Sequence, residues 1–87
     1  MSRWQRHPEV LWRRSGARRV LNCPSSEEVV VVDGSGSLVW DLLTEPVAEG
    51  ELTTMLSEHF DVDEDLVRDE VVGFLDGLHG VGAVVNT

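Results

Sequence analysis

The sequence predicts an α+β domain of winged helix-turn-helix type, in which three antiparallel strands are followed by three helices. Short β-prone runs separated by turn residues fill the first third of the chain, and apolar residues at helical spacing fill the rest. A chain of 87 residues is long enough for one domain only. Because strands and helices are segregated along the chain, we expect the sheet on one side of the helices.

The three strands are expected at residues 10–13, 19–23 and 28–32. Ser15-Gly16 supplies the turn of a hairpin between the first two, and residues 24–26 break the chain before the third. The third run contains four consecutive valines, whose branched side chains suit a pleated strand better than a helix. It is the strongest strand signal in the sequence.

The first helix is expected around residues 38–43 and should end at Glu45-Pro46, because proline disfavours helical geometry in its predecessor. A second helix is predicted over residues 48–59. The third and longest follows a run of acids at residues 61–65, which complement the positive end of the helix dipole, and it ends at Gly80. Residues 83–85 could return as a short strand. The apolar residues expected to face the core from the third helix are Val67, Val71, Phe74, Leu75 and Leu78.

The charge of the chain is divided between its two parts. Residues 1–20 hold six arginines and one acid, whereas residues 21–87 hold fifteen acids and Arg68 alone, which gives the net charge of −9. An acidic surface repels phosphates, so nucleic acid is not expected as a partner. No apolar run approaches the roughly 20 residues that span a bilayer, and no signal peptide is recognised. We therefore expect no membrane association and a cytoplasmic location.

Residues that could carry chemistry are isolated from one another. His7, His59 and His79 are far apart and have no cysteine or acid at metal-ligand spacing, so neither a metal nor a cofactor is expected. Cys23, the lone cysteine, has no recognisable base partner and is interpreted as a small buried residue. The sequence therefore predicts that the protein is not an enzyme.

Several short motifs, in their order and spacing, resemble the PqqD family, whose fold is also called the RiPP recognition element. The resemblance covers nearly the whole chain. Its early marks are residues 6–8, Trp12-Arg13, Val20-Leu21 and residues 37–43 (SLVWDLL). Its later marks are Glu51-Leu52 and then Val71, Phe74, Leu75, Leu78, Gly82 and Val84. The resemblance implies a single peptide-recognition domain over residues 1–87, and we expect residues 1–7 to be flexible.

The resemblance also implies a function. Members of the family bind the leader of a ribosomally made precursor peptide as an added antiparallel strand beside the third strand, in a groove walled by the third helix. They present the precursor to a separate maturation enzyme, such as a radical enzyme, a protease or a cyclase. The residues expected to bind the peptide are Glu28, Val29, Val30, Val31, Val32, Leu66, Val67, Glu70, Val71, Gly73, Phe74 and Gly77.

Two features of the residues fit this mode, although each has a second interpretation. The four valines could leave unpaired backbone groups at a sheet edge, guarded by Glu27 and Glu28, or they could form a buried central strand. Gly73 and Gly77 lie one turn apart, where each costs about 1 kcal/mol relative to alanine. They could admit the backbone of a leader or a neighbouring helix of the same domain.

Two other functions and one assembly remain as alternatives. The segment Gly34–Leu38 distantly resembles the attachment motif of a carrier protein, with Ser37 as the modified residue. A winged-helix regulator of DNA would share the architecture, but its recognition helix should be basic. An exposed valine edge would also allow two copies to pair as a homodimer.

Overall fold

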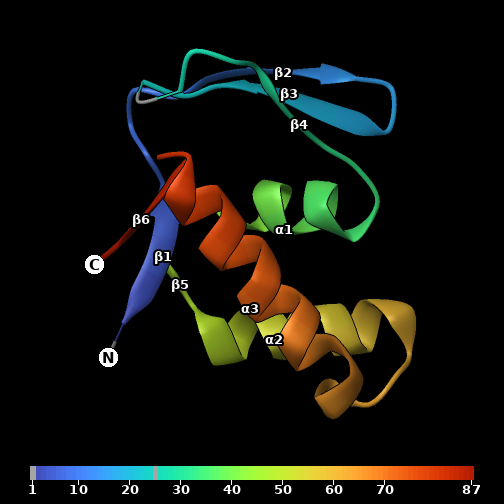
Figure 1. Cartoon of the computed structure of the whole chain (residues 1–87). Helices are drawn as coiled ribbons and strands as arrows, with labels where there is room; N and C mark the ends of the chain where they lie inside the picture. The colour runs from blue at the N-terminus through green and yellow to red at the C-terminus, as the bar shows by residue number, and fades with distance from the viewer. Residues whose placement is uncertain (1, 25) are drawn as a thin grey trace.

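The computed structural model describes residues 2–24 and 26–87 and shows an α+β fold with two small antiparallel sheets and a layer of helices (Figure 1). The elements in chain order are β1 (Arg3–Arg6), β2 (Leu11–Ser15), β3 (Arg18–Asn22), β4 (Val30–Val32), α1 (Ser35–Leu42), β5 (Val47–Ala48), α2 (Glu49–Phe60), α3 (Glu64–Gly80) and β6 (Val84–Asn86). The predicted fold class, with strands preceding three helices, is confirmed.

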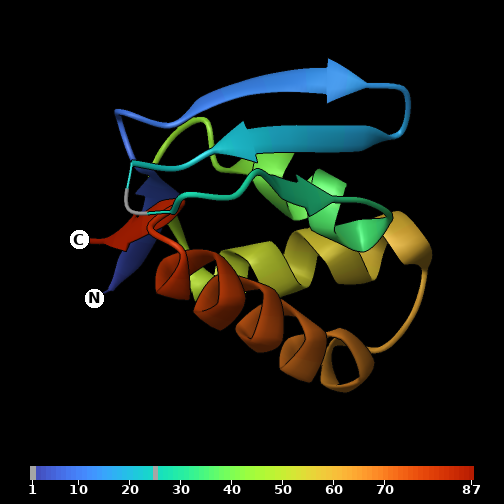
Figure 2. The ribbon, with the colours of Figure 1, turned by 45° about the horizontal axis from the view of Figure 1, so that its top comes forward.

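The three strands expected from the sequence form one sheet in the order β2-β3-β4. Its register pairs Trp12 with Leu21 and Leu21 with Val30, so these three side chains share one face. That face lies over α1 (Figure 2), where the indole of Trp12 meets the edge of the buried Trp40 at a centroid distance of 6.0 Å. The hairpin and the third strand therefore form a cover for the helical layer.

A second sheet, in the order β5-β1-β6, was not expected from the sequence except for its last strand. Residues 3–6, expected to belong to a flexible terminus, form β1 between the other two strands. Trp4 is half-buried there and packs edge to face against His79 at the end of α3, with ring centroids 5.6 Å apart. Long-range pairing thus orders a segment whose own sequence carries no strand signal.

Helices α2 and α3 pack side by side, and α1 lies between them and the β2-β3-β4 sheet (Figures 1 and 2). Trp40 is fully buried at the centre of this arrangement. From α3, the core contains Val67, Val71, Leu75 and Leu78 as predicted, whereas Phe74 is only partly buried. The other fully buried large side chains are Leu21, Val39, Leu43, Leu52, Leu56 and Val84.

The third strand is shorter than the sequence indicates, because β4 begins at Val30 and not at residue 28. A turn precedes it, in which the N–H of Ser26 donates to the carbonyl of Cys23 (3.1 Å) and the Ser26 hydroxyl donates to the carbonyl of Glu28 (2.9 Å). These bonds hold residues 26–28 in a bend. Glu28 and Val29 consequently lie outside the ladder.

Candidate functional site

Strand β4 is an edge of its sheet, with β3 on one side and no strand pairing on the other among residues 2–24 and 26–87. Its valines alternate as a half-buried strand requires. Val32 is buried and Val30 is partly buried, whereas Val31 and the preceding Val29 are 53% and 52% exposed. The interpretation of the valine run as a central strand is therefore wrong, and the strand presents backbone groups at an open edge.

A groove of about 260 Å³ lies between β4 and α3. Figure 2 shows the two elements on the same side of the molecule. Its lining is almost entirely apolar. It consists of Val30 and Val32 from β4, Gly73, Phe74, Gly77 and Leu78 from α3, and Val81 just after the helix. Two elements far apart in the sequence thus face each other across a hollow without polar side chains in its lining.

The two glycines make the groove open along α3. A Cβ built on Gly73 or on Gly77 meets no atom within 4 Å outside its own helix and neighbours. No neighbouring helix of this domain uses the space, so that interpretation of the glycine pair is wrong for the described residues. Gly36 of α1 is different, because its Cβ would lie 2.8 Å from Cε1 of Phe74. The ring of Phe74 therefore closes over α1 and forms part of the groove wall.

The sequence-predicted site residues fall into three groups in space. Five line the groove: Val30, Val32, Gly73, Phe74 and Gly77. Val67 and Val71 are buried in the core, and Glu28, Val29, Val31, Leu66 and Glu70 are exposed outside the lining.

Sequence reasoning missed Leu78 and Val81, which complete the lining. The helical spacing predicts Leu78 as a core residue only. The position of Val81, four residues after Gly77 and just past the end of α3, is a signal that could have found it.

One end of the groove is tied to the first helix. The hydroxyl of Ser35, at the start of α1, donates to Oε1 of Glu70 on α3 over 2.6 Å. Glu70 precedes Gly73 by nearly one turn and lies on the same flank of α3. A carboxylate therefore stands beside the groove at the end nearest α1.

The edge strand is held in place by a buried serine. Ser37 is 5% exposed, and its hydroxyl lies 3.1 Å from the carbonyl oxygen of Val32 and 2.9 Å from that of Ala17. These contacts fix the end of β4 and the β2–β3 turn to α1. A hydroxyl in this position is not accessible for attachment of a carrier arm, which removes the structural basis of the carrier-protein alternative.

An ion pair anchors β3 to the same helix. Nε and Nη2 of Arg19 donate to the two carboxylate oxygens of Asp41 over 2.9 and 2.8 Å. This hydrogen-bonded guanidinium holds the pKa of Asp41 below its usual value, and the carboxylate in turn raises the pKa of Arg19. The bidentate geometry makes the pair an ordered support for the sheet.

A second arginine joins the two sheets. The guanidinium of Arg6 on β1 lies 4.7 and 4.8 Å from the ring centroids of Trp12 and Trp40 and donates to the carbonyl of Trp40. Burial lowers the pKa of Arg6, an effect that the nearby Asp41 opposes. Arg6 therefore packs as a cation between two aromatic rings.

The remaining candidate groups do not converge on a site. Burial raises the pKa of Cys23, which keeps its thiol protonated. His7 accepts from the N–H of Glu9, His59 contacts Phe60, and His79 contacts Trp4. A second hollow, of about 360 Å³, is lined by Gly50, Glu51, Thr54 and Met55 of α2 alone. It has no second wall from another element.

None of the helices that the structure describes is long and apolar enough to cross a bilayer. Comparison with known proteins returned no match among curated proteins and no match among solved structures. The family model described as coenzyme PQQ synthesis protein D (PqqD) matches residues 18–84. The matched region extends from β3 to the start of β6 and so contains both walls of the groove. The chain therefore belongs to the PqqD family, the family of RiPP recognition elements.

Proposed function

We propose that this protein binds the leader of a ribosomally made precursor peptide as an additional antiparallel strand beside β4, in the groove between β4 and α3. The observation that carries the proposal is the open β4 edge facing an apolar groove whose glycines are uncovered. In this mode, backbone hydrogen bonds to the edge supply affinity and alternate side chains of the peptide enter the groove.

The protein acts as a non-catalytic chaperone in this proposal. Membership of the PqqD family implies a role in the biosynthesis of PQQ or a related peptide product, together with partner enzymes. Holding the leader keeps the core of the precursor at a high effective concentration for a separate maturation enzyme. The chemistry then belongs to that enzyme, and this chain supplies recognition.

DNA is a poor alternative ligand for the same helix. Asp69 and Asp76 are exposed on α3, and its one arginine, Arg68, is paired with Asp65 over 2.8 Å. An acidic helix repels the phosphate backbone that a recognition helix must approach. A second copy of the chain, pairing through its own β4, is a competing occupant of the edge that the leader would displace.

The proposal is tested by titrating the leader and the core of a candidate precursor peptide, as separate peptides, against isotope-labelled protein. We expect submicromolar binding of the leader alone. Amide shifts should be concentrated at Val30–Val32 and at Gly73 and Gly77, because these residues flank the groove. Slower hydrogen exchange of the β4 amides in the complex would show that they have gained partners.

A matched pair of variants separates binding from folding. Gly73→Leu fills the groove and should weaken leader binding at least tenfold, whereas Gly50→Leu places the same side chain in open space on α2 and should leave it unchanged. Both should fold, since neither added Cβ meets an atom within 4 Å. Equal affinity of both variants for the leader, or shifts confined to another face, would contradict the proposal.

A further inference from the structure

The short edge of β4 limits what backbone pairing can contribute. Successive residues of a strand direct their N–H and C=O groups to alternate sides, so only one or two of the three residues Val30–Val32 offer these groups to a peptide. Each such hydrogen bond contributes little net free energy, because it replaces hydrogen bonds to water. Side-chain contacts in the groove between β4 and α3 must therefore add to the affinity from these backbone bonds and supply nearly all of the selectivity.

The open flank of α3 has an acidic border. On a helix that advances 100° per residue, Asp69 and Asp76 lie about 20° apart and about 40–60° beyond Gly73, on the side away from the core. Both carboxylates are exposed and make no hydrogen bond or ion pair with the described residues. The glycines therefore form a bare strip between the apolar groove and two free carboxylates.

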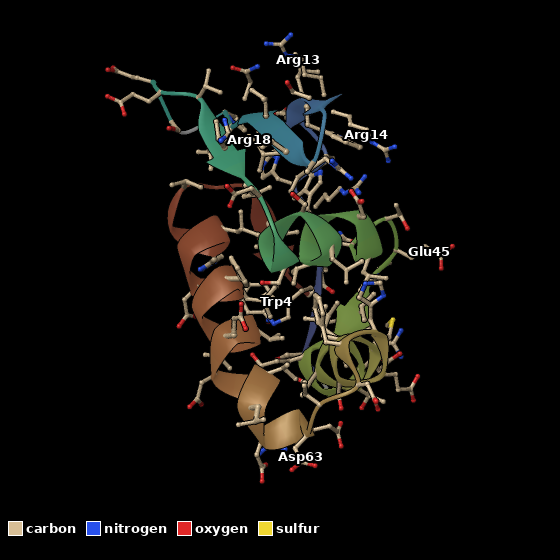
Figure 3. The ribbon with its side chains drawn as sticks, turned by 90° about the vertical axis from the view of Figure 1, so that its right-hand side faces the viewer. Trp4, Arg13, Arg14, Arg18, Glu45 and Asp63 are labelled. Carbon is tan, nitrogen blue, oxygen red and sulfur yellow. The ribbon has the colours of Figure 1, made fainter. Side chains whose placement is uncertain are left out.

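The basic groups near the groove do not offset these acids. Arg68 faces the opposite side of α3 and is paired with Asp65, while Arg19, opposite Val32, is paired with Asp41. Arg13, Arg14 and Arg18 lie at the β2–β3 end of the molecule (Figure 3).

Arg19 is the basic residue that pairs with β4 in register, opposite Val32, and Arg18 is the next one, a position further from the strand. Glu27 and Glu28 precede β4, and Asp33 follows it. The open flank of α3 and the start of β4 therefore carry more acidic than basic side chains.

We propose that the groove selects a leader segment in which apolar residues alternate with positions that include lysine or arginine. The inference rests on the proposed function and names the chemistry of the peptide that it requires. An apolar side chain occupies the hollow between Val30, Val32 and Phe74. A lysine or arginine lays its aliphatic stem across Gly73 and Gly77, and its charge reaches Asp69 and Asp76.

The test selects random dodecapeptides on the immobilised protein, in parallel with two variants that each lose two charges. D69N/D76N removes the acidic border, and E45Q/E58Q removes two exposed carboxylates from the Glu45 turn and α2. Figure 3 places Glu45 on the opposite side of the molecule from β4 and α3. This control is needed because a chain of net charge −9 attracts any basic peptide.

We expect the wild type and E45Q/E58Q to enrich peptides with alternating apolar residues and an excess of lysine and arginine over acids. D69N/D76N should keep the alternation and lose the excess. An enriched peptide, measured by fluorescence anisotropy, should bind D69N/D76N roughly two- to twentyfold more weakly than the wild type and E45Q/E58Q. The difference should shrink as salt is raised.

The outcomes distinguish this inference from the proposed function. The inference would be overturned if the wild type enriched alternating peptides without an excess of lysine and arginine. It would also be overturned if D69N/D76N enriched alternating peptides with the same excess. Strand addition would stand in both cases. Absence of any alternating peptide from the wild-type selection would overturn strand addition itself, and the inference with it.

Discussion

The two sides of α3 differ in how closely other residues of the domain pack against them. Val71 and Leu75 are fully buried against the core, whereas one flank of the same helix presents Gly73 and Gly77 to empty space. Helix interiors disfavour glycine by about 1 kcal/mol each, so the domain forgoes stability along the flank that borders β4. The residues that stabilise the core and those that border the groove are thus separated by about 120–160° around one helix.

The largest effect is expected on the packed side. Leu75→Ala should lower the free energy of unfolding by about 2–5 kcal/mol, because the substitution leaves a cavity in a core that cannot collapse fully. Leu66→Ala, at a leucine of the same helix that is 70% exposed, should change it by less than about 0.5 kcal/mol. Urea denaturation measures both, and equal losses would remove the distinction between the two sides.

The next largest effect concerns the ion pair between Arg19 and Asp41, which anchors β3 to α1. Asp41 has a lower pKa in the folded protein than in the unfolded chain because Arg19 hydrogen-bonds its carboxylate. Its contribution is therefore fully present above its unfolded pKa of about 3.9 and is lost as pH falls through the folded pKa. D41N should cost about 1–3 kcal/mol at neutral pH, and the difference from wild type should narrow in acid. Urea denaturation at a series of pH values measures it, and a constant difference would contradict this assignment.

A third prediction concerns Phe74, whose ring packs against Gly36 of α1 and also lines the groove. Gly36→Ala should destabilise the domain by about 1–2 kcal/mol, because the new Cβ would lie 2.8 Å from the ring of Phe74 and the ring must shift. The shift should also weaken leader binding, since Phe74 lines the groove. Phe74→Leu in the same background should recover part of the lost stability. Thermal denaturation of the single and double variants measures both effects, and a neutral Gly36→Ala would mean that Phe74 moves freely.

Most of what locates the groove could be predicted from the sequence. The valine run indicated an extended segment, the spacing of Val67, Val71, Leu75 and Leu78 predicted the buried face of α3, and the glycine pair indicated its thin flank. These signals are local, because strand and helix periodicities are set by the backbone. Whether the valine strand lay at an edge depends on sheet order, which the structure supplied.

The features that were missed depend on contacts between distant segments. Strand β1 exists because its residues pair with β5 and β6, and Arg6 is fixed by two tryptophans from different elements. The close approach of Gly36 to Phe74 joins residues that are 38 positions apart in the sequence. A periodic pattern carries no information about such pairs. The hydrogen-bonded turn before β4 likewise makes this strand shorter than the valine run predicts.

The last predicted effect on stability is small and has the opposite sign to the losses above. Gly73→Ala should raise the free energy of unfolding by about 0.5–1 kcal/mol, because alanine is the better helix former and its methyl group meets no atom within 4 Å. The same glycine-to-alanine change at Gly36 should lower it. The methyl group would occupy the strip that a bound peptide crosses, so leader affinity should fall as stability rises. Denaturation and anisotropy measured on the same samples would show the two quantities moving in opposite directions. A destabilised Gly73→Ala would mean that this flank is already packed, and that no peptide needs to cover it.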